Sequence, residues 1–482
     1  CLGCYGQLPQ APDYFCSKCG WPLCDKDCES EGYHPLECPV FVKSKYKFNL
    51  GDFSEEFSLY ESILPLRCLL LKSHDPKKWN TLRAMESHDD LRRGSELWNH
   101  QQVGVCDFLR KKIKIPEQDA EIHTVSGVLD INCHEVKSEM SASDECRIRG
   151  LYPLCAMLSH DCFSNTLHTF IDEMTMVMIA SRDIPKGDLV TGTYTHLLSG
   201  TTERRKHLRY GKLFDCVCAR CSDPTELGTF MSALRCTHQG CGGNVLNCNP
   251  LHPNNKADYA CNKCRHQVSV NVVSRLTNLI YYELQNAGEN NVAALEGIFN
   301  KYKPLLHPNH FHLIGIKHTL SQLYGRTPGY MISELTQEQL ARKAECCRDL
   351  LAVIDVIDPG VSRLRGLTKY ELHAPLLLKA NREFQQMLLT REHFLQQLQE
   401  TLKLLQDTVF SLQYEMPRSQ EGQVCQIARG SSEELGKWIA TVRQLPKSNF
   451  LAAATTTTAC DDSNAFEEEL TLEALLIKIE TY

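Results

Sequence analysis

Closely spaced cysteines are the residues of this sequence whose types and spacing could do chemistry. The chain of 482 residues holds 25 cysteines, and all but four of them lie before residue 265. In a compartment that keeps thiols reduced, close cysteine pairs are typical of metal sites rather than of disulfides. We therefore predict that metal ions hold the first half of the chain together, whereas the second half forms a hydrophobic core of its own.

The first 38 residues carry four metal-binding pairs. The eight ligands are Cys1, Cys4, Cys16, Cys19, Cys24, Cys28, His34 and Cys38. A tetrahedral zinc ion takes four such ligands, so this segment predicts two ions. A segment this short cannot form a core and needs metal to fold. Two lysines and six acidic residues give it a net charge of -4, which favours a protein or peptide partner over a phosphate backbone.

Two further cysteine groups precede residue 265. Cys216, Cys218 and Cys221 are one ligand short of a closed site. Cys162 is the leading candidate for the fourth ligand, and a buried packing thiol is the alternative for it. Two more pairs have the form of a zinc ribbon, with Cys248 as a weaker substitute: Cys236, Cys241, Cys261 and Cys264. These sixteen ligands predict four closed, structural zinc sites with no open catalytic position.

The spacing of apolar residues changes along the chain. Helical periodicity covers roughly residues 51–114, and short strands follow from about 124 to 195. Among these strands, 174–180 is followed by a turn at 185–187 and a return strand at 189–194. Helical periodicity resumes after the last cysteine group and continues to about residue 445. One apolar stripe with steps of three and four residues comprises Phe394, Leu398, Leu402, Leu405, Val409 and Leu412.

The composition is that of a globular protein. Hydrophobic residues make up 42% and charged residues 23%, with a formal net charge of -7. No run approaches the roughly 18 apolar residues that cross a bilayer, and the N-terminus has no secretory pattern. We therefore expect a cytoplasmic or nuclear protein without membrane contact. Because the chain opens on Cys1 rather than on methionine, we expect its natural start to lie upstream.

Several motifs together resemble one family. One segment resembles the GLYP…LNHSC signature of SET methyltransferases of the SMYD type; its sequence is Gly150-Leu-Tyr-Pro-Leu-Cys-Ala-Met-Leu-Ser-His-Asp-Cys162. In addition, residues 1–38 look like a MYND zinc finger. The matching motifs that follow are Arg182-Asp-Ile-Pro-Lys-Gly187, Gly192-Thr-Tyr194, Glu203-Arg-Arg-Lys206 and the post-SET cysteines from Cys216. The segments Val356-Ile-Asp-Pro359 and Tyr370-Glu-Leu-His-Ala-Pro375 look most like the arthropod-specific SmydA/msta branch.

The resemblance implies a fold and a domain order. The implied fold is α+β, with a β-rich SET core that the MYND finger interrupts, post-SET zinc modules and an all-helical, tetratricopeptide-like C-terminal domain. The implied divisions are the finger at 1–38, a helical insert at 39–123, the core SET region at 124–200, the post-SET region and ribbon at 201–268, the helical domain at 269–446, and a flexible linker and tail at 447–482. In the finger, it implies that Cys1, Cys4, Cys24 and Cys28 bind one ion and Cys16, Cys19, His34 and Cys38 the other.

The resemblance also implies an activity and its residues. The activity is transfer of a methyl group from S-adenosylmethionine to a lysine side chain of a histone or non-histone protein. Such a transfer needs a deprotonated lysine, aligned in a narrow, dry channel. Tyr194 matches the channel tyrosine and is the expected catalytic residue. The expected cofactor contacts are His88, Asn132, Leu158, Ser159, His160, Tyr194 and Phe214. The alternatives are an exposed helix-end residue for His88 and a structural aromatic for Tyr194.

Some positions depart from the family pattern. Ser159 replaces an asparagine whose amide both donates and accepts hydrogen bonds. His134 stands where the lysine channel commonly has phenylalanine, and Leu189 replaces the second acid of the GEEL turn. Lys212 occupies the place of a second channel tyrosine, with Tyr210 two residues away. In addition, the family's first SET strand is expected before the finger. These departures leave a second hypothesis open, a catalytically weak or silent SET/MYND scaffold that binds other proteins.

The expected partner is a protein or peptide substrate, and the chain is expected to be a monomer. A DNA-binding regulator is disfavoured because the finger is acidic. Two basic runs, at residues 110–112 and 204–206, are expected to be solvated helix faces rather than nucleic-acid contacts.

Overall fold

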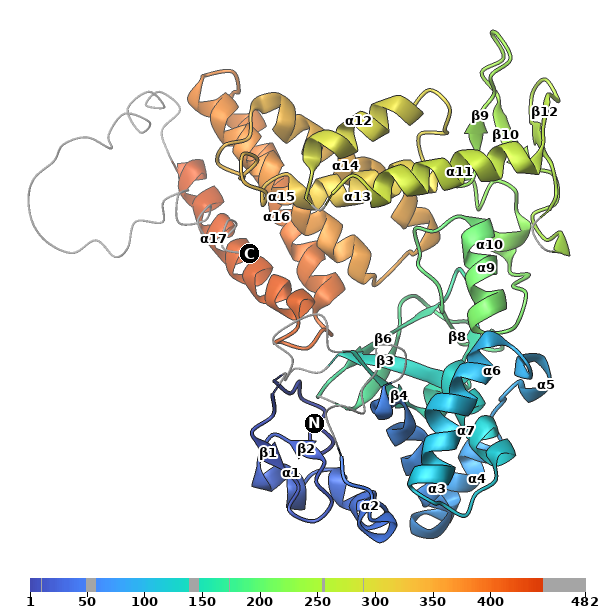
Figure 1. Cartoon of the computed structure of the whole chain (residues 1–482). Coiled ribbons are helices and arrows are strands. Elements are labelled where there is room, and N and C mark those ends of the chain that lie inside the picture. Colours follow the sequence, from blue (N-terminus) through green and yellow to red (C-terminus); the bar gives the residue numbers. More distant parts are fainter. Residues whose placement is uncertain are drawn as a thin grey trace, which may run out of the picture. The chain divides into compact units, whose positions relative to one another are not determined.

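The chain folds into two compact units of helices and short strands (Figure 1). The computed structural model describes residues 1–9, 11–48, 58–137, 147–172, 174–253, 256–288 and 290–444. The first unit comprises Cys1–Ser159, Asp172–Met176 and His207–Asp215, and the second comprises His160–Ile171, Val177–Lys206 and Cys216–Tyr482. The tail predicted at 447–482 lies outside the described residues. The division into six segments is finer than these two units and stays a prediction.

The N-terminal part of the first unit has few regular elements. They are β1 (Tyr14–Phe15), β2 (Pro22–Leu23), α1 (Lys26–Ser30), η1 (His34–Leu36) and α2 (Cys38–Ser44). Asp25 caps α1 by accepting a hydrogen bond of 2.9 Å from the Cys28 N–H, which fixes the start of this cysteine-bearing helix. Trp21 is fully buried against Phe41. Both rings belong to the core of the unit, so the segment relies on neighbouring helices and on its ligand groups for stability.

Helices fill the next stretch of the first unit, as the sequence predicts up to about residue 114. The last of them continues to Asn132, so the prediction of strands from about residue 124 is wrong for this segment. The helices are η3 (Leu59–Ser62), α3 (Ile63–His74), α4 (Pro76–Arg83), α5 (Asp89–Arg92), α6 (Glu96–Gln101), the π-helical η4 (Gln102–Cys106) and η5 (Phe108–Lys112), and α7 (Asp119–Asn132). Leu66, Leu109 and Leu129 lie in their common core. The antiparallel pair β3 (Cys133–Lys137) and β4 (Arg147–Leu151), and then α8 (Pro153–Ala156), follow.

Four short strands follow in the next part of the chain. They are β5 (Ser159–His160), β6 (Thr166–Phe170), β7 (Met176–Ala180) and β8 (Thr191–Gly192), and β5 pairs with β8 whereas β6 pairs with β7. The predicted turn is present, because the Asp188 N–H donates to the Pro185 carbonyl at 3.1 Å. The predicted pairing of the return strand with 174–180 is wrong. Asn165 explains the difference, since its side chain accepts from the Thr191 N–H and donates to the Leu189 carbonyl, both at 2.8 Å.

Two helices and a small antiparallel sheet come next. They are α9 (Thr201–Gly211), α10 (Ala219–Ser222), β9 (Leu234–Arg235), β10 (Asn244–Asn247), β11 (Tyr259–Cys261) and β12 (Gln267–Val268), with the sheet order β12-β11-β10-β9. The prediction of a solvated face at 204–206 is wrong for its two arginines. Arg204 and Arg205 are only 1% and 2% exposed, because Arg205 donates to the carbonyls of Pro250 and Leu251 and Arg204 enters a buried ion network. In the run at 110–112, the two lysines are exposed.

The rest of the second unit is helical. The helices are α11 (Val270–Gln285), α12 (Val292–Tyr302), α13 (Phe311–Leu323), α14 (Gln337–Ile357), α15 (Arg363–Gln385), α16 (Arg391–Leu412) and α17 (Gln420–Gln444), and each packs beside the next (Figure 1). A capping box between Thr336 and Gln339 begins α14. The predicted stripe on α16 lies in the core, with Leu402 and Val409 partly buried. Within the described ranges, no helix is long and apolar enough to cross a membrane.

Candidate metal centres and active site

The sixteen predicted metal ligands lie in four groups of four. The groups are Cys1, Cys4, Cys24 and Cys28; Cys16, Cys19, His34 and Cys38; Cys162, Cys216, Cys218 and Cys221; and Cys236, Cys241, Cys261 and Cys264. Zinc–sulfur bonds of about 2.3 Å in a tetrahedron place two sulfurs about 3.8 Å apart. Six Sγ–Sγ distances within the groups range from 3.5 to 4.0 Å. Each group could therefore hold a zinc ion, with the interleaved arrangement in the finger.

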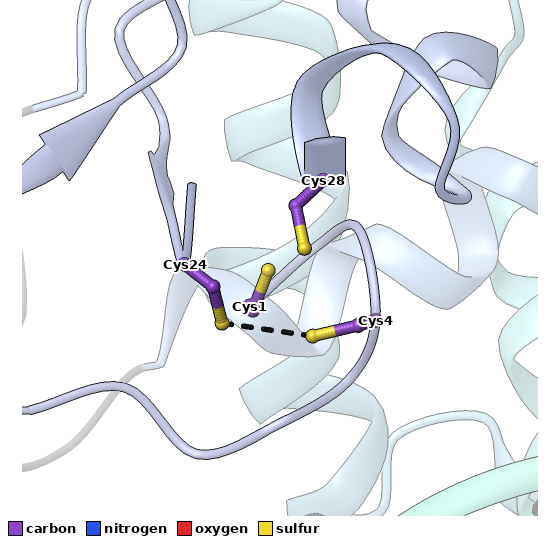
Figure 2. A group of neighbouring side chains, drawn as sticks. All are labelled: Cys1, Cys4, Cys24 and Cys28. Atoms are coloured by element: carbon purple, nitrogen blue, oxygen red, sulfur yellow. Dashed lines mark hydrogen bonds between the residues drawn. The ribbon is translucent and has the colours of Figure 1, made fainter. Parts of the chain in front are cut away.

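The first group joins the N-terminal loop to α1. Figure 2 shows the sulfur atoms of Cys1, Cys4, Cys24 and Cys28 gathered about a common centre, and the Sγ atoms of Cys4 and Cys24 are 3.6 Å apart. Backbone N–H groups two residues further along the chain donate to the sulfurs of Cys1 and Cys4, at 3.3 and 3.4 Å. Such bonds stabilise thiolates, which are the form of cysteine that binds metal.

In the second group, a carboxylate orients the histidine ligand. The His34 Nε2 is 3.3 Å from the Cys19 Sγ, and the His34 Nδ1 is 3.1 Å from a Glu37 oxygen. Glu37 is fully buried and accepts two hydrogen bonds from the Arg67 guanidinium, at 2.8 and 2.7 Å. A carboxylate behind a ligand histidine fixes its tautomer and ring orientation. The sequence analysis missed Glu37, although its position three residues after His34 was a usable signal.

Replacing Glu37 with glutamine should weaken zinc binding by the second group by about tenfold to a hundredfold. The carboxamide removes the negative charge that faces both the imidazole and the guanidinium. Zinc affinity is measured by competition with a chromophoric chelator. Glu31→Gln is the matched control, because Glu31 is an exposed acid of the same segment. Equal zinc affinity in Glu37→Gln and Glu31→Gln would show that Glu37 does not support the metal.

The third group contains Cys162, the predicted fourth ligand. Its Sγ is 4.0 Å from that of Cys216 and 3.5 Å from that of Cys221. Hydrogen bonds with Cys216, Cys218 and Cys221 lower the pKa of the Cys162 thiol well below its usual range. The group thus has a thiolate available for a metal ion.

An ion network that the sequence analysis missed surrounds this third group. The Arg204 Nη1 is 2.7 Å from a Glu226 oxygen, and the Arg204 Nη2 donates to the Cys221 Sγ at 3.6 Å. The Arg220 Nη2 is 3.5 Å from the same Glu226 oxygen and donates to the Leu197 carbonyl at 2.9 Å. All three charged side chains are at most 1% exposed. Burial, and then the charge of Arg204, lower the pKa of Arg220 to about 10.

The fourth group lies in the small sheet and its turns. Cys248 is not one of its members, because the ligand atoms that come together are those of the two predicted pairs. The Cys248 backbone pairs with Asp258 at 2.9 Å, and its side chain is exposed. The ribbon pattern therefore identified the right four cysteines.

Folded protein should contain four zinc ions per chain. Each of the four groups offers a complete tetrahedral set, so no group depends on a ligand from another molecule. Elemental analysis of protein prepared without chelators measures this content directly. Two zinc ions or fewer per folded chain would contradict the prediction.

Five of the predicted cofactor contacts lie in the first unit. Asn132 and His88 both approach Glu86: the Asn132 amide donates to the Glu86 carbonyl at 3.0 Å, and the His88 N–H donates to the Glu86 carboxylate at 2.8 Å. His88 begins α5 and is half-buried. Leu158 is half-buried before β5, and Ser159 is exposed in β5. Phe214 is half-buried in the segment after α9.

The structure also places the positions that depart from the family pattern. The Lys212 ammonium donates to the Ile131 carbonyl at 2.6 Å. There it binds a carbonyl near the C-terminus of α7, where a cation is favourable. Burial lowers the pKa of Lys212, and burial followed by the charge of Lys212 lowers the pKa of His134. The side chains of Leu189 and Tyr210 are exposed.

His160 and Tyr194, the other two predicted contacts, lie in the second unit. The Tyr194 N–H donates to the His160 Nδ1 at 3.0 Å, and the two ring centroids are 5.1 Å apart. On its other side, the His160 Nε2 is 3.3 Å from the Cys162 Sγ. Burial raises the pKa of Tyr194, so its hydroxyl keeps its proton at neutral pH. The predicted cofactor residues thus form two local sets, one in each unit.

A cavity of about 760 Å³ in the second unit adjoins the segment that carries Tyr194. Thr193 and Thr195, on either side of that tyrosine, line it together with residues of α12 and α13. Among the described residues of the lining, none is an aspartate, glutamate, lysine or arginine. Such a lining favours neutral groups over charged ones.

Comparison with known proteins tests the family resemblance. No protein-family model matches the sequence. The SET domain-containing protein SmydA-8, isoform A, of Drosophila melanogaster is 27% identical over 383 residues, which cover 77% of this chain and 78% of the relative. The histone-lysine N-methyltransferase ASHR1 of Arabidopsis thaliana is 23% identical over 370 residues, 74% of this chain and 71% of the relative. The N-lysine methyltransferase SMYD2 of Rattus norvegicus is 26% identical over 214 residues, 43% of this chain and 47% of the relative. These relatives confirm that the chain resembles the family of SET and MYND domain proteins, including the Drosophila SmydA branch.

Proposed function

We propose that the chain is an S-adenosylmethionine-dependent protein-lysine N-methyltransferase. Relatives that match about three quarters of the chain support this proposal, and one of them is named a histone-lysine N-methyltransferase. The observation that carries it is the setting of Tyr194. His160 holds its backbone, its phenol stays protonated, and its two chain neighbours line a cavity whose lining has no aspartate, glutamate, lysine or arginine among the described residues.

The residues would divide the work as follows. Bound S-adenosylmethionine supplies a methyl group that its sulfonium activates. Ser159, His160 and Phe214 would hold the cofactor, with His88 and Asn132 at its other contacts. The Tyr194 hydroxyl would align the lysine amine with the methyl group. The neutral cavity next to Tyr194 would favour the uncharged amine, which is the form that attacks.

The wider architecture of the proposal follows from the same family. Strands β5 to β8 would belong to the SET core, and α11 to α17 would form the tetratricopeptide-like domain. The four zinc ions would be structural.

The partner would be a protein or peptide that enters the cavity between Tyr194's segment and helices α12 and α13. We propose a monomer that does not bind nucleic acid directly and acts in the cytoplasm, the nucleus or both.

Gly315→Leu should lower kcat/KM for a peptide substrate by about tenfold, which equals about 1.4 kcal/mol. Gly315 lies on α13 in the cavity lining, and a Cβ atom added there meets no other atom within 4 Å. The leucine would therefore extend from an open position into space that the substrate needs, and the variant's melting temperature should be measured beside its activity. The measurement is kcat/KM with the best peptide of an array, beside cofactor affinity, which should not change.

The matched control is Gly297→Leu on α12. A Cβ atom added at Gly297 also meets no atom within 4 Å, and Gly297 is not part of the cavity lining. Both variants gain helix propensity to the same extent. If the two variants have the same kcat/KM, the cavity is not the substrate site.

The alternative, a catalytically silent scaffold, has specific observations in its favour. Ser159 lacks the side-chain amide of asparagine, and the structure holds the Lys212 ammonium on the end of α7. Isothermal titration of the zinc-loaded chain with S-adenosylmethionine separates the two functions. We expect binding of one cofactor per chain. The absence of heat from binding across the micromolar to millimolar range would favour the scaffold.

A further inference from the structure

We propose that His160 is a positioning residue that couples metal binding by the third group to the placement of Tyr194. The third group is Cys162, Cys216, Cys218 and Cys221. The two ring nitrogens of His160 contact the two sites separately: Nδ1 contacts the backbone of Tyr194, and Nε2 contacts the Cys162 sulfur. The catalytic meaning of this coupling rests on the proposed function, but the coupling itself does not.

The hydrogen bonds fix the tautomer of His160. The Tyr194 N–H donates to Nδ1 at 3.0 Å, so Nδ1 has no proton. In the neutral ring, the proton must then lie on Nε2, which is 3.3 Å from the Cys162 Sγ. The imidazole therefore donates to the thiolate of Cys162. A thiolate that binds zinc keeps its capacity to accept such a bond, and the donor orients it.

The surrounding backbone makes the link a stiff one. The Asp161 N–H donates to the Gly192 carbonyl at 3.0 Å, so the chain on either side of His160 pairs with the strand that leads to Tyr194. Cys162 and Tyr194 thus lie at the two ends of one short bridge through His160. When the metal holds the Cys162 sulfur in place, the ring and the Tyr194 amide are held with it. When the metal leaves, Cys162 can turn away and the restraint on Tyr194 is lost.

The test uses the zinc-loaded chain and two measurements that need no catalysis. The first is hydrogen exchange of the Tyr194 amide, read by mass spectrometry with fragmentation to single residues. The second is the rate at which each zinc ion passes to a competing chelator. In His160→Leu, which loses both contacts, we expect the Tyr194 amide to exchange about tenfold faster or more. We also expect one of the four zinc ions to leave about tenfold faster.

Two further comparisons test the coupling. His160→Asn keeps an acceptor near the place of Nδ1 but cannot reach Cys162, so it should protect the Tyr194 amide while the zinc ion still leaves fast. Cys218→Ser weakens the third group at a ligand other than Cys162, and it should speed exchange at Tyr194 about fivefold in the native background but not in His160→Leu. Cys264→Ser in the fourth group is the matched control and should leave exchange at Tyr194 unchanged.

Three results would overturn the proposal. The first is a Tyr194 amide that exchanges within about twofold of the native rate in His160→Leu. The second is an equal effect of Cys218→Ser and Cys264→Ser on that exchange rate. The third is an equal effect of Cys218→Ser on it in the native background and in His160→Leu. If Cys218→Ser does not fold, His160→Asn decides the matter. It should keep exchange of the Tyr194 amide slow and still release the zinc ion fast, and any other combination contradicts the coupling. A protein without methyltransferase activity could still pass every one of these tests, so failure of the coupling and failure of the proposed function are distinguishable.

Discussion

Glu226→Gln should destabilise the second unit by about 3 kcal/mol or more. Glu226 is the carboxylate that faces the buried guanidiniums of Arg204 and Arg220. The carboxamide is neutral, and its NH₂ end would point donors at other donors. Two buried cations would then lack their compensating charge beside the third metal group. The melting temperature should fall by roughly 5 °C or more, and zinc should leave the third group faster.

Glu283→Gln is the matched control for this prediction. Glu283 pairs with Lys301 at 2.6 Å, but that lysine is 56% exposed, and exposed pairs contribute only about 0 to 1 kcal/mol. Differential scanning calorimetry of both zinc-loaded variants measures the difference. Equal melting temperatures for Glu226→Gln and Glu283→Gln would contradict the importance of the buried network.

Tyr194→Phe should lower the turnover of methyl transfer by about tenfold or more, which equals about 1.4 kcal/mol. The substitution keeps the ring and the backbone bond to His160 but deletes the hydroxyl. That hydroxyl would fix the line of attack, so its loss should affect the transition state more than ground-state binding. Cofactor affinity by titration and the melting temperature should therefore stay close to those of the native chain.

Tyr210→Phe is the control for the loss of a phenol. The side chain of Tyr210 is 72% exposed, and its position does not match the family's channel tyrosine. Turnover of Tyr210→Phe should equal that of the native chain. If Tyr194→Phe and Tyr210→Phe turn over equally fast, Tyr194 is not the channel residue.

The grouping of the candidate metal ligands could be predicted from the sequence because their spacing is local. Pairs two to five residues apart place two ligand atoms on one side of a turn, whatever the rest of the chain does. Even Cys162, which is 54 residues from Cys216, could be found, because three ligands at 216–221 required a fourth. The helical stripe on α16 was predictable for a similar reason, since a spacing of three and four residues defines one face.

The features that the sequence did not reveal depend on contacts between distant residues. The strand at 189–194 follows a turn, which suggested a hairpin with 174–180, but two hydrogen bonds from Asn165 hold it elsewhere. From the sequence, the arginines of 204–206 were expected to lie on a solvated helix face. Their burial depends on Glu226 and on the carbonyls of Pro250 and Leu251, none of which any local pattern connects to α9.

The candidate cofactor contacts could be proposed from the sequence, but their surroundings could not. The family motifs identify Tyr194 and His160, and the structure brings their rings to 5.1 Å. The resemblance placed Lys212 at a channel tyrosine, and only the structure shows its ammonium on the Ile131 carbonyl at the end of α7. A motif fixes which residue stands at a position, whereas the partner of a long, flexible side chain depends on the fold around it.

Transfer of tritium from labelled S-adenosylmethionine to an array of lysine-containing peptides tests the central claim most directly. The zinc-loaded native chain, Tyr194→Phe and a native sample without peptide are measured side by side. The account predicts label on a subset of peptides, none on the same peptides with lysine replaced by arginine, and at least about tenfold less label with Tyr194→Phe. The contrary result is a native chain that binds the cofactor but labels no peptide, and a Tyr194→Phe variant that behaves in the same way. That result would contradict a methyltransferase and identify a scaffold.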